Sequence, residues 1–117
     1  MVKPVNVDEI LSGNSVDHVF EPFRDGIEIC RLLEGEPAVA MLRYSPGAQV
    51  PRHTHKGLET VLVLEGAQRD DNGTYGPGTL ILNQEGSDHA VASDDGCIVL
   101  IQWARPIEFH NTGDASS

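Results

Sequence analysis

Turn signals at short intervals are the feature of this sequence that most restricts its fold. Between residues 21 and 109, short apolar segments alternate with dipeptides that favour turns, which are Asp25-Gly26, Glu34-Gly35, Pro46-Gly47, Asn72-Gly73, Pro77-Gly78 and Asp95-Gly96. Short strands separated by such turns are typical of β-sandwiches and β-barrels. Asn-Gly and Asp-Gly also match the type I′ turn, in which both central residues need a positive φ, so we expect antiparallel strands on either side of them.

This pattern predicts eight strands, at residues 26–33, 38–44, 47–55, 59–64, 67–70, 79–83, 89–92 and 97–104. One short turn of helix is indicated by the capping-box pattern from Asn6 to Glu9, which precedes two apolar residues and stops at Gly13. Hydrophobic residues make up 39% of the chain but aromatic residues only 5%, so the core must consist mainly of aliphatic side chains. Cys30 and Cys97 show no metal-ligand spacing, and we interpret both as buried core residues.

The chain length of 117 residues suits one domain. We expect an ordered core at about residues 20–109, an N-terminal arm at 1–19 and a frayed tail at 110–117. Eight Lys and Arg against 18 Asp and Glu give a formal net charge of −10, which repels phosphate backbones and anionic lipids, so we expect no nucleic acid and no membrane partner. The sequence has no apolar run of membrane-spanning length and no signal-peptide pattern, which predicts a cytoplasmic protein.

Two histidines and a glutamate fall within seven residues in the segment PRHTHKGLET. Alternate residues of a strand point to the same face, so His53 and His55 would face the same side with Cα atoms roughly 6.5 to 7 Å apart. A short glycine-containing segment then allows the chain to bend and bring the carboxylate of Glu59 back toward both rings. His18 and His110 lie outside this pattern, and we assign them no role.

Residues 47–66 match the first sequence motif of the cupin superfamily at every fixed position, which are Gly47, His53, His55, Glu59 and Gly66. The segment GTLILNQEGSDHAVAS resembles the second cupin motif through Gly78, Gly86 and His89, but it has Gln84 where proline is usual and Ser93 where asparagine is usual. The resemblance implies that His89 is the fourth metal ligand. It also leaves the turn around Gln84 in question.

The segments that flank these motifs indicate which group of cupins the sequence resembles. FEPFRDGIEICRLLEG, AMLRYSPGAQVPRHTH, TVLVLEGAQRDDNGTYGPGT and GSDHAVASDDGC are similar to the ChrR-type cupins, the group that includes the C-terminal domain of a zinc-containing anti-sigma factor and relatives of diketone-cleaving dioxygenases. This resemblance implies an all-β fold, a double-stranded β-helix or RmlC-like jelly roll of two antiparallel sheets. It also implies a homodimer, for which we expect a contact through the segment before Gly26.

Three neutral imidazoles and one carboxylate form a ligand set that suits one divalent transition metal per chain. Zinc and iron are the first candidates, and nickel, manganese and copper accept the same donors. Calcium and magnesium are disfavoured because they prefer oxygen ligands. The complete predicted set is His53, His55, Glu59 and His89. We assign no catalytic residue beyond these ligands and no organic cofactor.

Two functions remain open at this point. The first is a mononuclear metal-dependent dioxygenase in which a small enolisable or phenolic compound binds the open face of the metal. The second is a module that is not an enzyme and that senses or binds a metal or a small ligand. Trp103 and Tyr75 would either line a ligand pocket or pack in the core.

Overall fold

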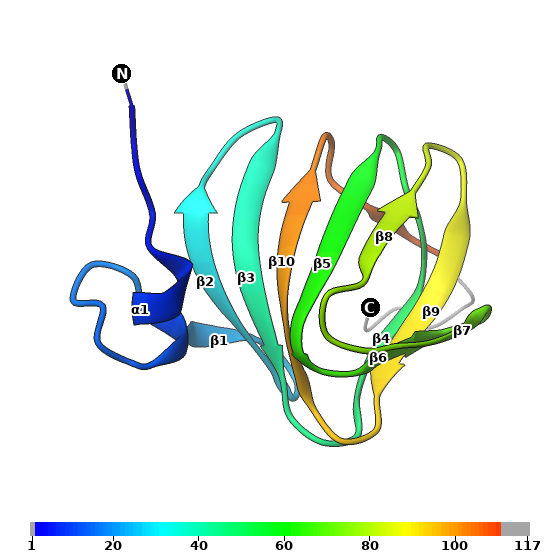
Figure 1. The fold of residues 1–117 in the computed structure, drawn as a ribbon. Coiled ribbons are helices and arrows are strands. Elements are labelled where there is room, and N and C mark those ends of the chain that lie inside the picture. Colours follow the sequence, from blue (N-terminus) through cyan, green and yellow to red (C-terminus); the bar gives the residue numbers. More distant parts are fainter. Residues whose placement is uncertain (1, 111–117) are drawn as a thin grey trace.

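The computed structural model describes residues 2–110, and almost all of its regular structure is strand (Figure 1). The elements follow the chain in the order α1 (Val7–Leu11), β1 (Glu21–Arg24), β2 (Ile27–Leu33), β3 (Ala38–Tyr44), β4 (Ala48–Thr54), β5 (Glu59–Gly66), β6 (Gln68–Asp70), β7 (Gly73–Tyr75), β8 (Leu80–Asn83), β9 (Asp88–Ser93), β10 (Cys97–Trp103) and β11 (Glu108–Phe109). Residues 111–117 of the predicted tail lie outside the described residues.

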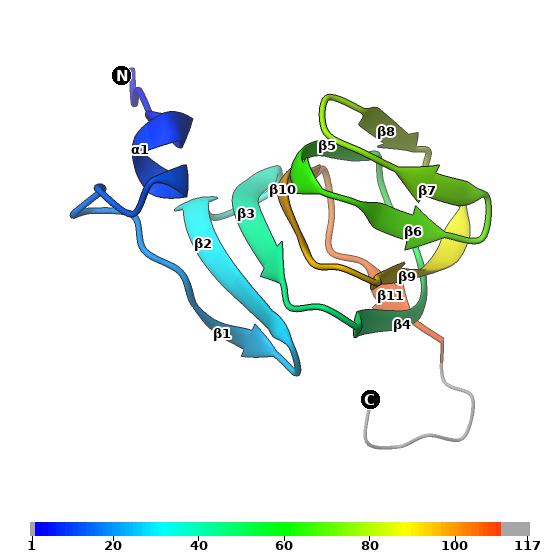
Figure 2. The same cartoon turned by 60° about the horizontal axis from the view of Figure 1, so that its bottom comes forward.

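The strands form two antiparallel sheets that face each other (Figure 2). The six-stranded sheet has the order β1-β2-β3-β10-β5-β8, and the five-stranded sheet has the order β11-β4-β9-β6-β7. The chain stays within one sheet from β1 to β3 and from β6 to β7, and it passes to the other sheet at every other connection between consecutive strands. This arrangement confirms the expected all-β jelly roll of two antiparallel sheets.

The main core lies between the sheets and consists mostly of aliphatic side chains. In β5, the buried residues Val61 and Val63 alternate with partly exposed leucines, as expected for a strand with one face toward a core. Val99 of β10 packs in the same core. Cys30 and Cys97 are both buried, which confirms their interpretation as core residues.

Helix α1 covers part of the outer face of the six-stranded sheet. Asn6 caps it as the sequence predicts, since the Asn6 side chain accepts a hydrogen bond of 3.1 Å from the backbone N–H of Glu9. Ile10 packs against Cys30 and Met41 on the outside of this sheet. Among the described residues, no helix has the length and apolar character needed to span a membrane.

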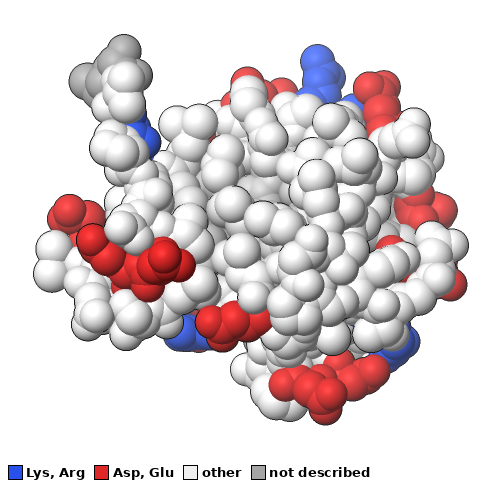
Figure 3. All heavy atoms as spheres, in the orientation of Figure 1, with Lys and Arg blue, Asp and Glu red and all other residues white. Residues whose placement is uncertain are grey.

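Beyond α1, the outer face of the six-stranded sheet is exposed and poor in charge. Leu80 and Leu82 of the edge strand β8 are 56% and 59% exposed. Figure 3 shows the acidic side chains mainly around the margin of this view, while the centre is free of charged groups. The chain has 8 basic and 18 acidic residues among 117, so a surface area with few charges stands out. Such an area is a candidate for contact between two copies of the chain.

The turns depart from the prediction in two respects. Among the described residues only glycines have a positive φ, so the Asp25-Gly26 and Asn72-Gly73 turns are not of type I′. Both nevertheless join antiparallel partners, β1 with β2 and β6 with β7. The expectation for Asp95-Gly96 is wrong, because this turn carries the chain from β9 in one sheet to β10 in the other.

Candidate metal centre

The four residues predicted to bind a metal come from both sheets and meet between them. His53 of β4 is the cross-strand partner of His89 of β9, which places the two side chains next to each other on the inner face of the five-stranded sheet. Glu59 is the first residue of β5 and projects from the six-stranded sheet, opposite the histidines. All four side chains are buried.

His55 lies one residue beyond the end of β4, and a turn holds its backbone in place. The N–H of His55 donates to the carbonyl oxygen of Ser87 at 2.9 Å, and the N–H of Gly86 donates to the carbonyl oxygen of His55 at 2.8 Å. His53 and His55 are both buried while Thr54 between them is partly exposed, so the two rings face the interior as predicted. Lys56, Gly57 and Leu58 then form the bend that returns the chain at Glu59.

The potential ligand atoms converge on one point. One atom from each of the four side chains lies within 4.8 Å of the other three. The imidazole centroids are 4.7 to 5.2 Å apart, and the ring planes meet at 73° to 86°. Two ligand atoms each about 2.1 Å from one ion lie at most about 4.2 Å apart. A shift of a few tenths of an ångström in the side chains therefore suffices for the set to fit one ion.

Hydrogen bonds fix the tautomer of each histidine. Nδ1 of His53 donates to the carbonyl oxygen of Pro51 at 2.8 Å, and Nδ1 of His55 donates to that of Ser87 at 3.0 Å. Nδ1 of His89 donates to Oδ2 of Asp70 at 3.1 Å. Carbonyl and carboxylate oxygens only accept, so each Nδ1 carries the proton and each neutral ring has its lone pair on Nε2.

Within the described part of the chain, two of the three Nε2 atoms are buried without a hydrogen-bond partner. Those of His55 and His89 are fully buried and make no hydrogen bond among the described residues. Buried polar atoms are nearly always paired, because an unpaired one loses its contact with water without compensation. A metal ion at the point where these atoms converge would satisfy them, so the donor set fits the predicted divalent metal.

Glu59 supplies the only carboxylate of the set. Nδ2 of Asn83 donates to its Oε1 at 3.0 Å and orients the group. Nε2 of His55 lies 3.3 Å from the same oxygen without the alignment of a hydrogen bond. Burial by itself lowers the pKa of His55, but the neighbouring Glu59 outweighs burial and holds this pKa above its ordinary value. Burial lowers the pKa of His53 and favours its neutral form.

Asp70 belongs to the site although the sequence did not indicate it. Its side chain is 3% exposed and accepts the hydrogen bond from His89 described above. The other carboxylate oxygen accepts hydrogen bonds from the Tyr75 hydroxyl at 3.0 Å and from the backbone N–H of Asn72 at 2.8 Å. A carboxylate in this position fixes the ring of a metal-binding histidine and makes its free nitrogen a better donor.

The two departures from the second cupin motif do not disturb the site. Residues 84–87 form a β-turn that closes with a 3.0 Å hydrogen bond from the N–H of Ser87 to the carbonyl oxygen of Gln84. Gly86, the third residue of this turn, has the positive φ of +89° that a type II turn requires there. Ser93 is fully buried, and its hydroxyl donates to the carbonyl oxygen of Ala67 at 2.6 Å.

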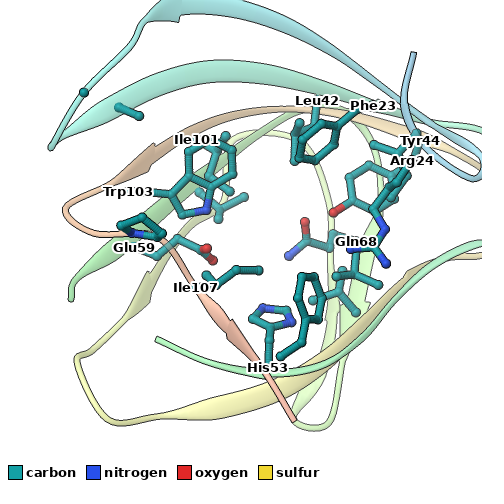
Figure 4. Close-up of a pocket in the computed structure, with 18 residues that line it drawn as sticks. Phe23, Arg24, Leu42, Tyr44, His53, Glu59, Gln68, Ile101, Trp103 and Ile107 are labelled. Atoms are coloured by element: carbon teal, nitrogen blue, oxygen red, sulfur yellow. The ribbon is translucent and has the colours of Figure 1, made fainter. Parts of the chain in front are cut away.

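A cavity of about 290 Å³ adjoins the candidate metal centre on the side of His53 and Glu59 (Figure 4). His53 and Glu59 form part of its wall, and Trp103 lines it as well. Most of the remaining wall is apolar, and it includes Ile27, Leu42, Val50, Val61, Val91, Ile101 and Phe109. Tyr75 does not line this cavity and instead packs against the core, with its hydroxyl on Asp70. The candidate metal centre therefore opens onto a space in which a small apolar molecule fits.

Comparison with known proteins agrees with the predicted resemblance. The chain is 36% identical over 89 residues to the anti-sigma-E factor ChrR of Cereibacter sphaeroides, which is 74% of this chain and 42% of that protein. It spans less than half the length of the curated relatives it matches. The structure also resembles that of Rhodobacter sphaeroides SigE in complex with the anti-sigma ChrR, with a TM-score of 0.72 and 27% identity over 86% of this chain and 57% of that chain.

A second solved structure shares the fold. The acetylacetone dioxygenase from Acinetobacter johnsonii superposes with a TM-score of 0.80 at 15% identity, covering 97% of this chain and 80% of that chain. Residues 12–105 match the protein family described as the ChrR Cupin-like domain. On the basis of this match and the identity to ChrR, the chain belongs to the family of ChrR cupin-like domains.

Proposed function

We propose that the protein binds one divalent transition metal ion through His53, His55, Glu59 and His89. The observation that carries this proposal is the convergence of three imidazoles whose Nδ1 atoms are all occupied by acceptors, while two of the buried Nε2 atoms have no partner. Zinc and iron suit this mixture of nitrogen and oxygen donors best, and nickel, manganese and copper accept it as well.

The site is further proposed to act on a small molecule. Structural metal sites are closed by their protein ligands, whereas catalytic ones keep a position open for water or substrate. Here His53 and Glu59 also line the cavity, so a compound bound there would lie beside the metal. The function that this arrangement supports best is that of a mononuclear metal-dependent dioxygenase for a small enolisable or phenolic compound.

The metal and the protein side chains would contribute differently to such a reaction. The metal, when bound, would activate the oxygen atoms of the substrate as a Lewis acid. The chain orients the three imidazoles through their Nδ1 hydrogen bonds and holds Glu59 through Asn83. The apolar wall excludes water from the bound compound and so strengthens the electrostatic contacts within the cavity.

A second function has support of a different kind. The 36% identity to the anti-sigma-E factor ChrR favours a module that binds a metal or ligand for regulation and catalyses no reaction. The shared fold does not decide between the two, since one fold hosts many functions. The solved dioxygenase is 15% identical and supports the enzyme proposal only at the level of the scaffold.

The metal carried by the purified protein tests both proposals. We expect about one transition metal per chain by elemental analysis of protein from cells grown without added metal, and a loss of this metal in His89→Ala. His18→Ala is the matched control, because this histidine lies outside the four-residue set. A wild-type protein that takes up none of zinc, iron, nickel, manganese and copper after reloading would refute the metal proposal.

Oxygen consumption then separates the enzyme from the module. Iron in the protein together with oxygen uptake that depends on acetylacetone or 2-hydroxyacetophenone would support the dioxygenase. Tightly held zinc, with no oxygen uptake from either compound in the zinc or the iron form, would contradict the dioxygenase and favour the regulatory module.

A further inference from the structure

Three polar side chains gather at the side of the cavity that faces away from Glu59. Arg24 ends β1, Tyr44 ends β3 and Gln68 begins β6, so three separate strands bring them together. Figure 4 shows them on the same side of the pocket, with Glu59 on the other side. Tyr44 and Gln68 are only 6% and 2% exposed, so the solvent outside the cavity cannot hydrate their polar groups well.

The polar groups of Tyr44 and Gln68 lack protein partners. Within residues 2–110, neither the Tyr44 hydroxyl nor the Gln68 amide makes a side-chain hydrogen bond with another residue, and neither is among the fully buried unpaired polar atoms, which belong to His55 and His89. Both side chains line the cavity, so their polar groups are open to it and available to a molecule bound there. Burial raises the pKa of Tyr44 far above its ordinary value, and the hydroxyl therefore keeps its proton and donates.

Arg24 is the one basic residue in the cavity wall. The chain has 18 acidic residues against 8 basic ones, and most of its other basic side chains form ion pairs, namely Arg31, Arg43, Arg52, Lys56 and Arg69. Arg24 pairs with no carboxylate among the described residues. Its guanidinium instead lies 4.8 Å from the centre of the Phe109 ring, a stacking contact that leaves its N–H groups free to donate.

We propose that Arg24, Tyr44 and Gln68 bind the carboxylate of a small organic acid whose largely apolar body carries its enolisable or phenolic group toward the metal centre. A guanidinium presents parallel N–H donors that match the two oxygens of a carboxylate, and the tyrosine hydroxyl and glutamine amide add further donors. This assignment deepens the proposed small-molecule function and rests on it. The cavity of about 290 Å³ lies near the lower end of the size range of ligand pockets, so the acid is compact, with about one ring.

Trp103 allows this inference to be measured directly. It is the only tryptophan in the chain and it lines the cavity, so its fluorescence reports on a bound molecule. We would titrate chelator-treated protein with phenylacetate and with phenylacetamide, which differ in charge and hardly in shape. Removing the metal ensures that the carboxylate has no ion to bind.

We expect phenylacetate to bind at least about tenfold more tightly than phenylacetamide, since hydrogen bonds to charged groups are worth roughly a factor of ten or more. Arg24→Gln should lose that advantage and keep its affinity for phenylacetamide, which also shows that the cavity is still folded. Arg105→Gln is the matched control, because Arg105 is exposed and does not line the cavity. Tyr44→Phe, which removes a single oxygen atom, should weaken phenylacetate binding about threefold or more.

Equal affinity for the acid and the amide in wild-type protein would overturn the inference, and so would an Arg24→Gln protein that binds phenylacetate as well as wild type does. A wild-type protein that does not bind phenylacetate at all would have the same consequence. Metal content, measured separately, keeps the two proposals apart. Metal binding without selectivity for the acid removes only the carboxylate site, and selectivity without metal binding removes only the metal proposal.

Discussion

Replacing Asp70 by asparagine should weaken metal binding without removing a metal ligand. In the native arrangement one Asp70 oxygen accepts from Nδ1 of His89, and the other accepts from the Tyr75 hydroxyl and the N–H of Asn72. An asparagine has one oxygen and one NH₂ group, so one of these donors must face another donor. If the NH₂ faces His89, the imidazole loses its acceptor and its proton can move to Nε2, where it blocks the lone pair.

The opposite orientation of the amide also carries a cost. The oxygen then accepts from His89, but the NH₂ meets the N–H of Asn72 and the turn between β6 and β7 is destabilised. In either orientation the negative charge that makes His89 a better donor is lost. Changes in such outer partners typically reduce metal affinity 10- to 100-fold, which corresponds to about 1.4 to 2.8 kcal/mol.

Competition with a chromophoric zinc chelator would measure this loss for Asp70→Asn. Asp94→Asn is a suitable control, since Asp94 is an exposed carboxylate paired with Arg69. Long-range ¹H–¹⁵N spectra of the imidazoles would show whether His89 has changed its tautomer, which a loss of general stability would not produce. An Asp70→Asn protein with wild-type zinc affinity and the wild-type tautomer would refute the role assigned to Asp70.

Three further predictions concern metal, fold and assembly. At a free zinc concentration about 100 times Kd, bound metal adds about 2.7 kcal/mol to the free energy of unfolding. Chelation should therefore lower the Tm of the wild-type protein by roughly 10 °C in a thermal scan, and an unchanged Tm would contradict the proposal that metal binding stabilises the fold. Glu59→Gln should remain folded by circular dichroism but hold less metal, with a Tm that no longer responds to chelator; an unfolded variant beside a folded, metal-free wild type would make Glu59 a structural residue. Homodimerisation, expected through the segment before Gly26, stays a prediction, for which light scattering should give twice the monomer mass; a monomeric wild type at high concentration would remove it. Leu82→Glu, on the charge-poor outer face of the six-stranded sheet, should weaken the dimer if this face takes part in the contact as well.

The convergence of the four candidate ligands could be predicted because it follows from local sequence motifs. His53, His55 and Glu59 follow one another at fixed spacing around a strand and a bend, and His89 falls within a second motif. The longer strands were predictable for a similar reason. In β3 and β10, apolar side chains fill a continuous segment between turn signals, and their observed bounds lie within a residue of the predicted ones.

What escaped prediction depends on contacts between distant segments. The strands β1, β7 and β11 have only two to four residues, too few to show a periodic pattern, and they are strands because a partner lies beside them. Asp70 escaped for the same reason. It lies in the sequence DDNG, which indicates a turn, and it reaches His89 only because β6 pairs with β9 through Arg69 and Ala92.

Phe109 explains why the short strand β11 matters for both proposed sites. Its ring lies 5.9 Å from the ring of His53 at an angle of 68°, and the guanidinium of Arg24 stacks on it at 4.8 Å. Phe109 is itself the cross-strand partner of His53, so the pairing of β11 with β4 sets its position. Phe109 therefore contacts both the candidate metal ligand His53 and Arg24, the residue proposed to bind the carboxylate of the ligand. Because side chains in a packed interior cannot shift independently, we expect that binding of a metal at one site changes the affinity of the other site for a carboxylate, through the position of this ring.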